Sequence, residues 1–175
     1  SPLFTLIDGF LPKTTYENDA NPEPEGNMIG RGFAAALVKV GVQHLGFIIG
    51  SAIALGMIGS ALFPSTPVPT VGNGFAFFVE AFGCMLLAWI RASTKYDPDS
   101  AHGSSSIAPL FLTRMALVFF SLLFTGTAVF NWGIYFGIAV FEGFNSSWWI
   151  YLLGALAGNA VGIAGWFWLT RQETE

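Results

Sequence analysis

The stretch that decides the fold is Met115–Val140, which reads MALVFFSLLFTGTAVFNWGIYFGIAV. It carries no charge over its 26 residues, yet Thr125-Gly126-Thr127 and then Asn131-Trp132-Gly133 interrupt the apolar run. A membrane span needs about 20 apolar residues, so this stretch is too long for one simple span. We predict a span over Met115–Phe130, then an unwound connection that re-enters the membrane and starts a short half-helix capped by the Asn131 side chain.

Three other apolar stretches predict further spans, at Leu45–Phe63, Gly74–Ile90 and Trp148–Thr170. Hydrophobic residues make up 53% of the chain and charged residues 10%, against about 25% charged in soluble domains. The sequence therefore predicts an all-α integral membrane protein with four transmembrane helices and a re-entrant half-helix.

The basic residues all fall at one end of these spans. They are Lys13, Arg31, Lys39, Arg91, Lys95, Arg114 and Arg171. The opposite side carries only Glu142. Because basic residues favour the cytoplasmic, stromal or matrix side of a membrane, we expect both termini there.

We expect the chain to divide into two parts, an extended N-terminal tail over residues 1–37 and a transmembrane domain over residues 38–175. The first 30 residues hold four of the nine prolines and much of the acidic charge behind the net charge of −4. This balance argues against nucleic acid as a partner, so the expected partners are membrane lipids and other membrane-protein subunits.

No enzyme signature stands out. The single Cys84 has no metal-ligand companion, and we expect a buried, inert thiol. We find no Ser-His-acid set at depth, no Cys/His metal cluster and no phosphate-binding glycine-rich loop. We therefore expect neither an enzyme nor a metal site.

Glycines at intervals of four predict close helix packing. Gly46 and Gly50 form one such pair, and Gly154, Gly158 and Gly162 form two more in register on the last span. Aromatic residues at the ends of the last span are typical of interfacial anchors; they are Trp148, Trp149, Tyr151, Trp166 and Trp168.

Five short regions, in the correct order, resemble the second half of the aquaporin, or major intrinsic protein, family. They are Gln43-His44-Leu45-Gly46 (third span), Phe78-Val79-Glu80-Ala81 (fourth), Asp97 with Ala108-Pro109-Leu110 (fifth), Asn131–Ala139 (second Asn-Pro-Ala signature and its half-helix) and Ser147–Tyr151 (sixth). The resemblance covers Val38 to Leu169. It implies an aquaporin-like partial bundle that lacks the first two spans and the first signature loop.

Departures from the family pattern bear on function. Asn131 keeps the amide of the signature, but Trp132 replaces its Pro and Gly133 its Ala. The family's selectivity arginine falls at Ile134, and its filter position that is His or Gly falls at Phe119 or one of its two neighbours. Two polar pore-lining positions have thus become apolar, and the groups that pass water singly and exclude protons are missing.

Polar residues at depth are the other candidates. The resemblance implies that Glu80 accepts hydrogen bonds from the backbone of the re-entrant loop; proton or ion handling and pigment or metal ligation are its alternatives. Arg114 either snorkels to the inner headgroups or pairs with an acid. Asn159 is expected to bond across helices, and Gln43 to be a structural polar residue.

His44 lies near the inner interface, where a packed or interfacial histidine is the simpler interpretation. Its alternative is a ring nitrogen that ligates a chlorophyll magnesium. No cofactor is required by the sequence, and bound lipid, chlorophyll or carotenoid are the ligands considered.

Three functions remain open. The first is a non-conducting, aquaporin-like accessory subunit of a larger membrane complex, such as a photosystem-antenna complex of a thylakoid or a respiratory complex of an organelle inner membrane. The second is an aquaporin-like channel for water or small neutral solutes assembled from two halves. The third, ranked last, is a pigment- or lipid-binding antenna protein.

Overall fold

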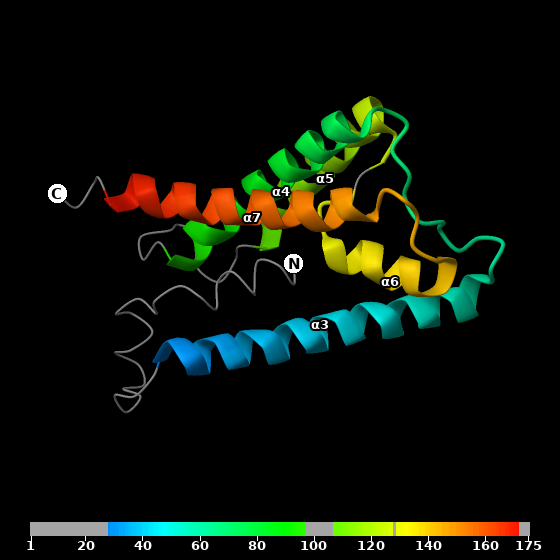
Figure 1. Ribbon diagram of the computed structural model, residues 1–175, viewed down its shortest axis with the longest axis horizontal. Helices are drawn as coiled ribbons and strands as arrows, with labels where there is room; N and C mark the ends of the chain where they lie inside the picture. The colour runs from blue at the N-terminus through cyan, green and yellow to red at the C-terminus, as the bar shows by residue number, and fades with distance from the viewer. Residues whose placement is uncertain (1–27, 97–106, 128, 172–175) are drawn as a thin grey trace.

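The computed structural model describes residues 28–96, 107–127 and 129–171, and these form five helices and no strand. The helices are α3 (Met28–Ile58), α4 (Asn73–Tyr96), α5 (Ile107–Thr125), α6 (Trp132–Glu142) and α7 (Trp148–Arg171). Figure 1 shows α4, α5 and α7 gathered on one side of the short helix α6, with α3 on the other side.

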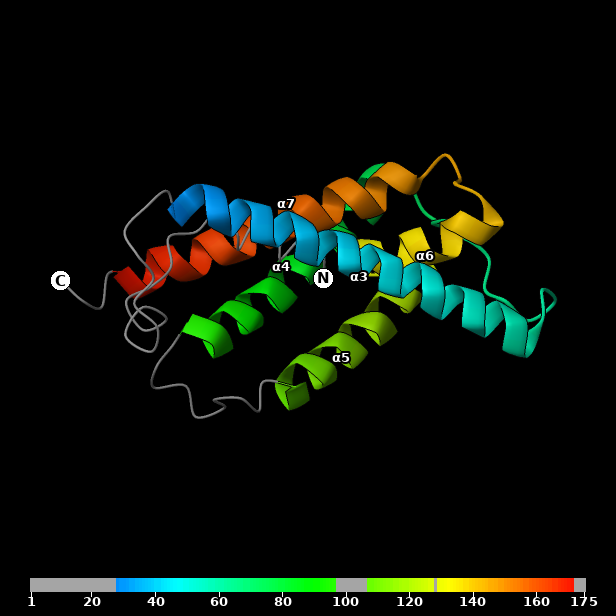
Figure 2. The same ribbon diagram turned by 90° about the horizontal axis from the view of Figure 1, so that it is seen from below.

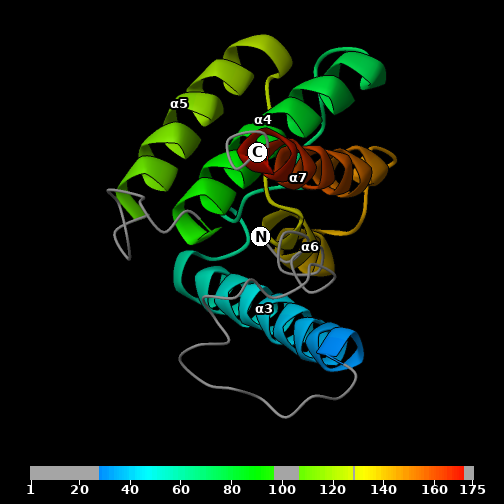
Figure 3. The same ribbon diagram turned by 90° about the vertical axis from the view of Figure 1, so that its left-hand side faces the viewer.

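Helix α4 has its most extensive packing with α7, while α3 packs against α6 and α5 packs against α4. Figure 3 shows α6 between α3 and the α4–α7 pair, and Figure 2, seen from the α3 side, shows α4 and α5 side by side. Helix α6 therefore lies between α3 and α7 and contacts both.

Three helices are long and apolar enough to cross a membrane, over Ala34–Ile58, Asn73–Ser93 and Trp148–Leu169. Helix α5 has 19 residues and so rises about 28 Å, close to the ~30 Å of a bilayer core. Helix α6 has 11 residues and rises about 16 Å, half of that thickness. The expected all-α fold is confirmed: three helices long enough to span a membrane and two shorter apolar helices are consistent with an aquaporin-like partial bundle.

Two of the expected boundaries are wrong. The third span was expected over roughly Met115–Phe130, but α5 begins at Ile107 and ends at Thr125, directly before the left-handed Gly126. The first span was expected from Leu45, but α3 begins at Met28 and so includes residues 28–37 of the expected tail. The division into tail and membrane domain stays a prediction.

The first turn of α3 and the last turns of α4 and α7 lie at the same end of the bundle (Figure 1). Arg91 lies in the last third of α4, which runs toward this end, and we call this end the basic end. The arrangement agrees with an even number of crossings. The side of the membrane that this end faces stays a prediction.

Glycines on α7 allow its close approach to α4. A Cβ added at Gly158 would collide with the Ala81 carbonyl oxygen, and one at Gly162 with the Met85 carbonyl oxygen. The packing predicted from the glycine spacing of the last span is confirmed. The same prediction is wrong for Gly46 and Gly50 within this chain, since nothing described lies within 4 Å of a Cβ at either.

We predict that Gly158→Ala lowers the free energy of unfolding by about 1–3 kcal/mol, because the added methyl group forces two backbones apart. Gly46→Ala is the matched control, and it should leave stability unchanged or raise it by up to about 1 kcal/mol. Thermal unfolding in detergent, followed by tryptophan fluorescence, measures both. Equal melting temperatures for the two variants would contradict the packing described.

Candidate functional site

The chain unwinds between α5 and α6, and we call residues 125–133 the re-entrant segment. Helix α5 ends at Thr125, and the next residue, Gly126, has φ +69°, a left-handed conformation that glycine adopts without strain. Thr70, in the loop before α4, donates from both its N–H and its Oγ1 to the Thr125 carbonyl, each at 3.0 Å. The last carbonyl of α5 is thereby satisfied.

Thr127 receives hydrogen bonds from two helices. Its carbonyl accepts from Ser121 Oγ at 2.6 Å and from Thr125 Oγ1 at 2.7 Å, both on α5. Its side-chain Oγ1 accepts from Tyr151 O–H on α7 at 3.2 Å. Tyr151 is only 2% exposed, so its expected role as an interfacial anchor is wrong: its hydroxyl points into the protein.

Glu80 on α4 holds the next two residues. Its carboxyl group, 3% exposed, accepts hydrogen bonds from the backbone N–H groups of Val129 and Phe130. Phe130 has φ +47°, a left-handed conformation that costs a non-glycine residue about 1–3 kcal/mol. Such a conformation persists only where the surrounding contacts hold it in place. Its ring lies over Gly83, where a Cβ would collide with it. This is the geometry that the family resemblance implies for Glu80.

Arg114 on α5 also turns toward the re-entrant segment. Its Nη2 donates to the Val129 carbonyl at 3.4 Å. The expected snorkelling toward headgroups is therefore not what the structure has, and Arg114 forms no ion pair with a described residue. The backbone of Val129 is held from both sides, by Glu80 at its N–H and by Arg114 at its carbonyl.

Asn131 caps α6, as predicted. Its backbone is extended (φ −163°, ψ 102°), and its Oδ1 accepts from the Gly133 N–H at 3.1 Å. The ring of Phe47, on α3, lies directly over Gly133, where a Cβ would collide with it. One turn later, Gly137 lies against the Phe47 carbonyl and Ser51 Oγ. Glycine at these two positions lets α3 approach α6.

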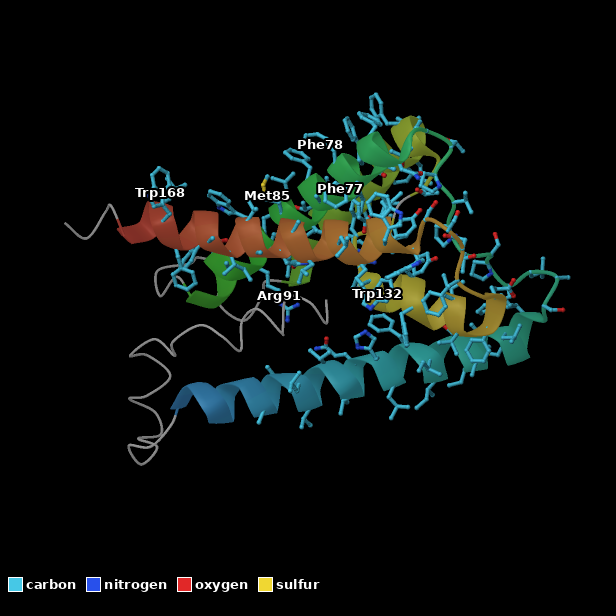
Figure 4. The ribbon with its side chains drawn as sticks, in the orientation of Figure 1. Phe77, Phe78, Met85, Arg91, Trp132 and Trp168 are labelled. Atoms are coloured by element: carbon cyan, nitrogen blue, oxygen red, sulfur yellow. The ribbon has the colours of Figure 1, made fainter. Side chains whose placement is uncertain are left out.

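An aromatic cluster fills the space beside the signature. The Trp132 ring, on α6, lies 5.5 Å from that of Tyr135 and 6.4 Å from that of Trp148, between centroids. Tyr135 in turn stacks on Tyr151 at 4.7 Å. Figure 4 shows Trp132 between α6 and the α4–α7 pair. The residue that replaces the family's proline is thus a packing residue.

The two expected filter positions lie in different surroundings. Ile134 is partly buried and packs against the core cluster around Tyr135. Phe119 is 64% exposed on α5, whereas its neighbour Val118 packs against that same cluster. The assignment of a filter residue on α5 stays a prediction.

The remaining predicted residues lie on α3 and α7. His44 Nδ1 donates to the Val40 carbonyl at 2.8 Å, and its ring meets Phe136 edge-on at 5.0 Å. Gln43, beside it, is half-buried. Asn159 Nδ2 donates to Ala155 on its own helix at 2.6 Å, which corrects the expected bond across helices. The described residues contain no group of three metal-ligating side chains.

A family model for the major intrinsic proteins matches residues 26–167. The chain belongs to the major intrinsic protein family. Comparison with curated proteins gave no significant match, and neither did comparison with solved structures. Proteins of this family are membrane channels and not enzymes.

In this major intrinsic protein chain, sequence reasoning missed one polar centre. Asn145, between α6 and α7, accepts at Oδ1 from Tyr135 O–H (3.1 Å) and from the Ser147 N–H (2.9 Å), and its Nδ2 donates to the Pro67 carbonyl (2.8 Å). It joins three segments distant in sequence. The available signal was an Asn three residues before a helix start, where its side chain can accept from the N–H two residues on in a local turn.

We predict that Glu80→Ala destabilises the protein by about 1–3 kcal/mol for each buried N–H that loses its acceptor, those of Val129 and Phe130. Glu80→Gln keeps one acceptor oxygen and should lose less. Thermal unfolding in detergent measures the difference. A melting temperature of Glu80→Ala equal to that of the wild type would contradict the scaffolding role of Glu80.

Proposed function

We propose that this protein is a non-conducting, aquaporin-like structural subunit of a larger membrane assembly. One observation supports it most: the segment that would line a pore is covered by the chain itself. Asn131 is 7% exposed, Trp132 is 8% exposed, and the Phe47 ring covers Gly133. A water pore needs hydrogen-bonding groups that face its lumen, so a covered signature is poorly suited to conduct.

The chemistry of the segment supports the same proposal. Ile134 stands where the family has its selectivity arginine and brings no positive charge to repel cations. Because the family builds a pore from two repeats, the helices described here supply one wall of such a pore.

The surface supports a partner-bound protein. Large apolar side chains are exposed along the outer faces of α3 and α5, among them Val38, Val42, Ile53, Phe111, Leu112, Phe120 and Leu123. Apolar surface of this extent faces lipid or another membrane protein. We propose that lipids cover part of it and that other subunits cover the rest.

A channel assembled from two halves is the second candidate. Membership of the major intrinsic protein family favours it, and so does the position of Asn131 at the edge of a cavity, because a partner could extend that cavity into a pore. The two candidates differ in whether reconstituted protein passes water and in what the protein associates with.

We predict that the purified protein in liposomes gives a water permeability no higher than that of empty liposomes, measured by stopped-flow light scattering. A conducting member of the same family, reconstituted at the same protein-to-lipid ratio, is the positive control. A clear increase that a bulky substitution such as Asn131→Trp abolishes would instead establish a channel.

The host in this proposal is an energy-transducing complex of an organelle, either a photosystem with its antenna or a respiratory complex. The termini then face the stroma or matrix, in keeping with the basic end. We predict that gently solubilised protein co-migrates with such a complex on a native gel, with the subunits identified by mass spectrometry. Migration as a small homo-oligomer, or as a pair with a second aquaporin-like half, would contradict the proposal.

A further inference from the structure

A cavity of about 160 Å³ lies between α4, α5, α7 and the re-entrant segment. The residues that line it include Cys84, Arg91, Arg114, Phe130, Asn131 and Asn159. Its volume compares with the ~150 Å³ of a cavity that admits a benzene molecule, so it has room for a phosphate group. Unlike such an apolar cavity, it has charged and amide side chains among its apolar lining residues.

The charges that face the cavity are positive. Arg91 and Arg114 both line it, and no carboxylate is among its lining residues. Figure 4 shows Arg91 pointing from α4 toward the side on which α3 lies. Arg114 makes one long hydrogen bond, to the Val129 carbonyl at 3.4 Å, and no ion pair with a described residue. The acid near it, Glu80, is engaged by the N–H groups of Val129 and Phe130.

A guanidinium inside a membrane domain is costly unless an anion or several hydrogen bonds compensate it. Arginine presents a planar fork of N–H donors that matches the oxygens of a phosphate group. The cavity beside Arg114 therefore has the charge and the donor geometry of an anion site.

Two buried amides complete the site. Asn131 Oδ1 is occupied by the Gly133 N–H, which leaves its NH₂ group as a donor at the cavity wall. Asn159, 3% exposed, donates from Nδ2 to Ala155 and so leaves its Oδ1 as an acceptor. A ligand that offers both anionic oxygens and a hydroxyl group satisfies both amides. The N-terminal end of α6, beside Asn131, adds a favourable dipole for an anion.

We propose that this cavity binds a phosphate group, either as inorganic phosphate or as the phosphodiester of an anionic phospholipid with a hydroxylated headgroup such as phosphatidylglycerol. Arg114 contacts the anionic oxygens, Asn131 donates to one of them, and Asn159 accepts from the hydroxyl. The proposal concerns a ligand and does not depend on whether the protein conducts water.

The test is the melting temperature of the full chain in detergent with phosphatidylcholine, titrated separately with inorganic phosphate and with short-chain phosphatidylglycerol. Sodium chloride at matched ionic strength is the control. A ligand that binds only the folded protein raises the melting temperature in a saturable way. A rise with phosphatidylglycerol alone assigns the site to lipid, a rise with phosphate alone to the free anion, and a rise with both to the phosphate group itself.

Arg114→Gln keeps a donor for the Val129 carbonyl but loses the charge, so the apparent Kd should rise about tenfold or more. Lys39→Gln removes one positive charge from the exposed surface of α3 and should leave the Kd unchanged. Equal affinity in both variants would overturn the proposal. The wild-type titration decides the matter even if Arg114→Gln does not fold, since no shift beyond that of chloride with either ligand would also overturn it.

Discussion

The structure depends on satisfying an unwound backbone at membrane depth. A helix bonds its own N–H and C=O groups, but the re-entrant segment lacks that regular pattern, and each group left unpaired in hydrocarbon costs several kcal/mol. The partners come from three helices: Glu80 of α4, Ser121 of α5 and Tyr151 of α7. These helices must therefore hold fixed positions around the segment, and the glycines of α7 bring Glu80 and Tyr151 close enough to do so.

The same constraint bears on function. Glu80 and Arg114 hold Val129 from both sides, and Phe130 is kept in a left-handed conformation with its ring on Gly83. The half-helix α6 starts where Asn131 caps it, and Phe47 of α3 closes over Gly133. We propose that the half-helix of the family is retained here with most of its signature segment covered by the chain. The polar space that remains lies on the basic side of Asn131, where arginines and amides line it.

Local sequence rules predicted the half-helix and its cap, because an Asn directly before an uncharged apolar run predicts a helix that begins there with the Asn as its N-cap. They also predicted the packing of α7, since its glycines repeat in register. They failed where tertiary contacts decide. Arg114 suggested snorkelling to the headgroups or an ion pair with an acid, yet its side chain donates to the Val129 carbonyl inside the protein. Tyr151 suggested an interfacial anchor, yet its hydroxyl bonds Thr127. Neither contact leaves a periodic signal in the sequence.

The most direct test of this account is a density map of the native particle after gentle solubilisation, at a resolution that shows side chains. The account predicts that Asn131, Trp132 and Gly133 remain covered by Phe47 and the aromatic cluster, with other subunits or lipids on the outer faces of α3 and α5. A continuous file of waters past Asn131, or a second aquaporin-like half that completes a pore around it, would contradict the account.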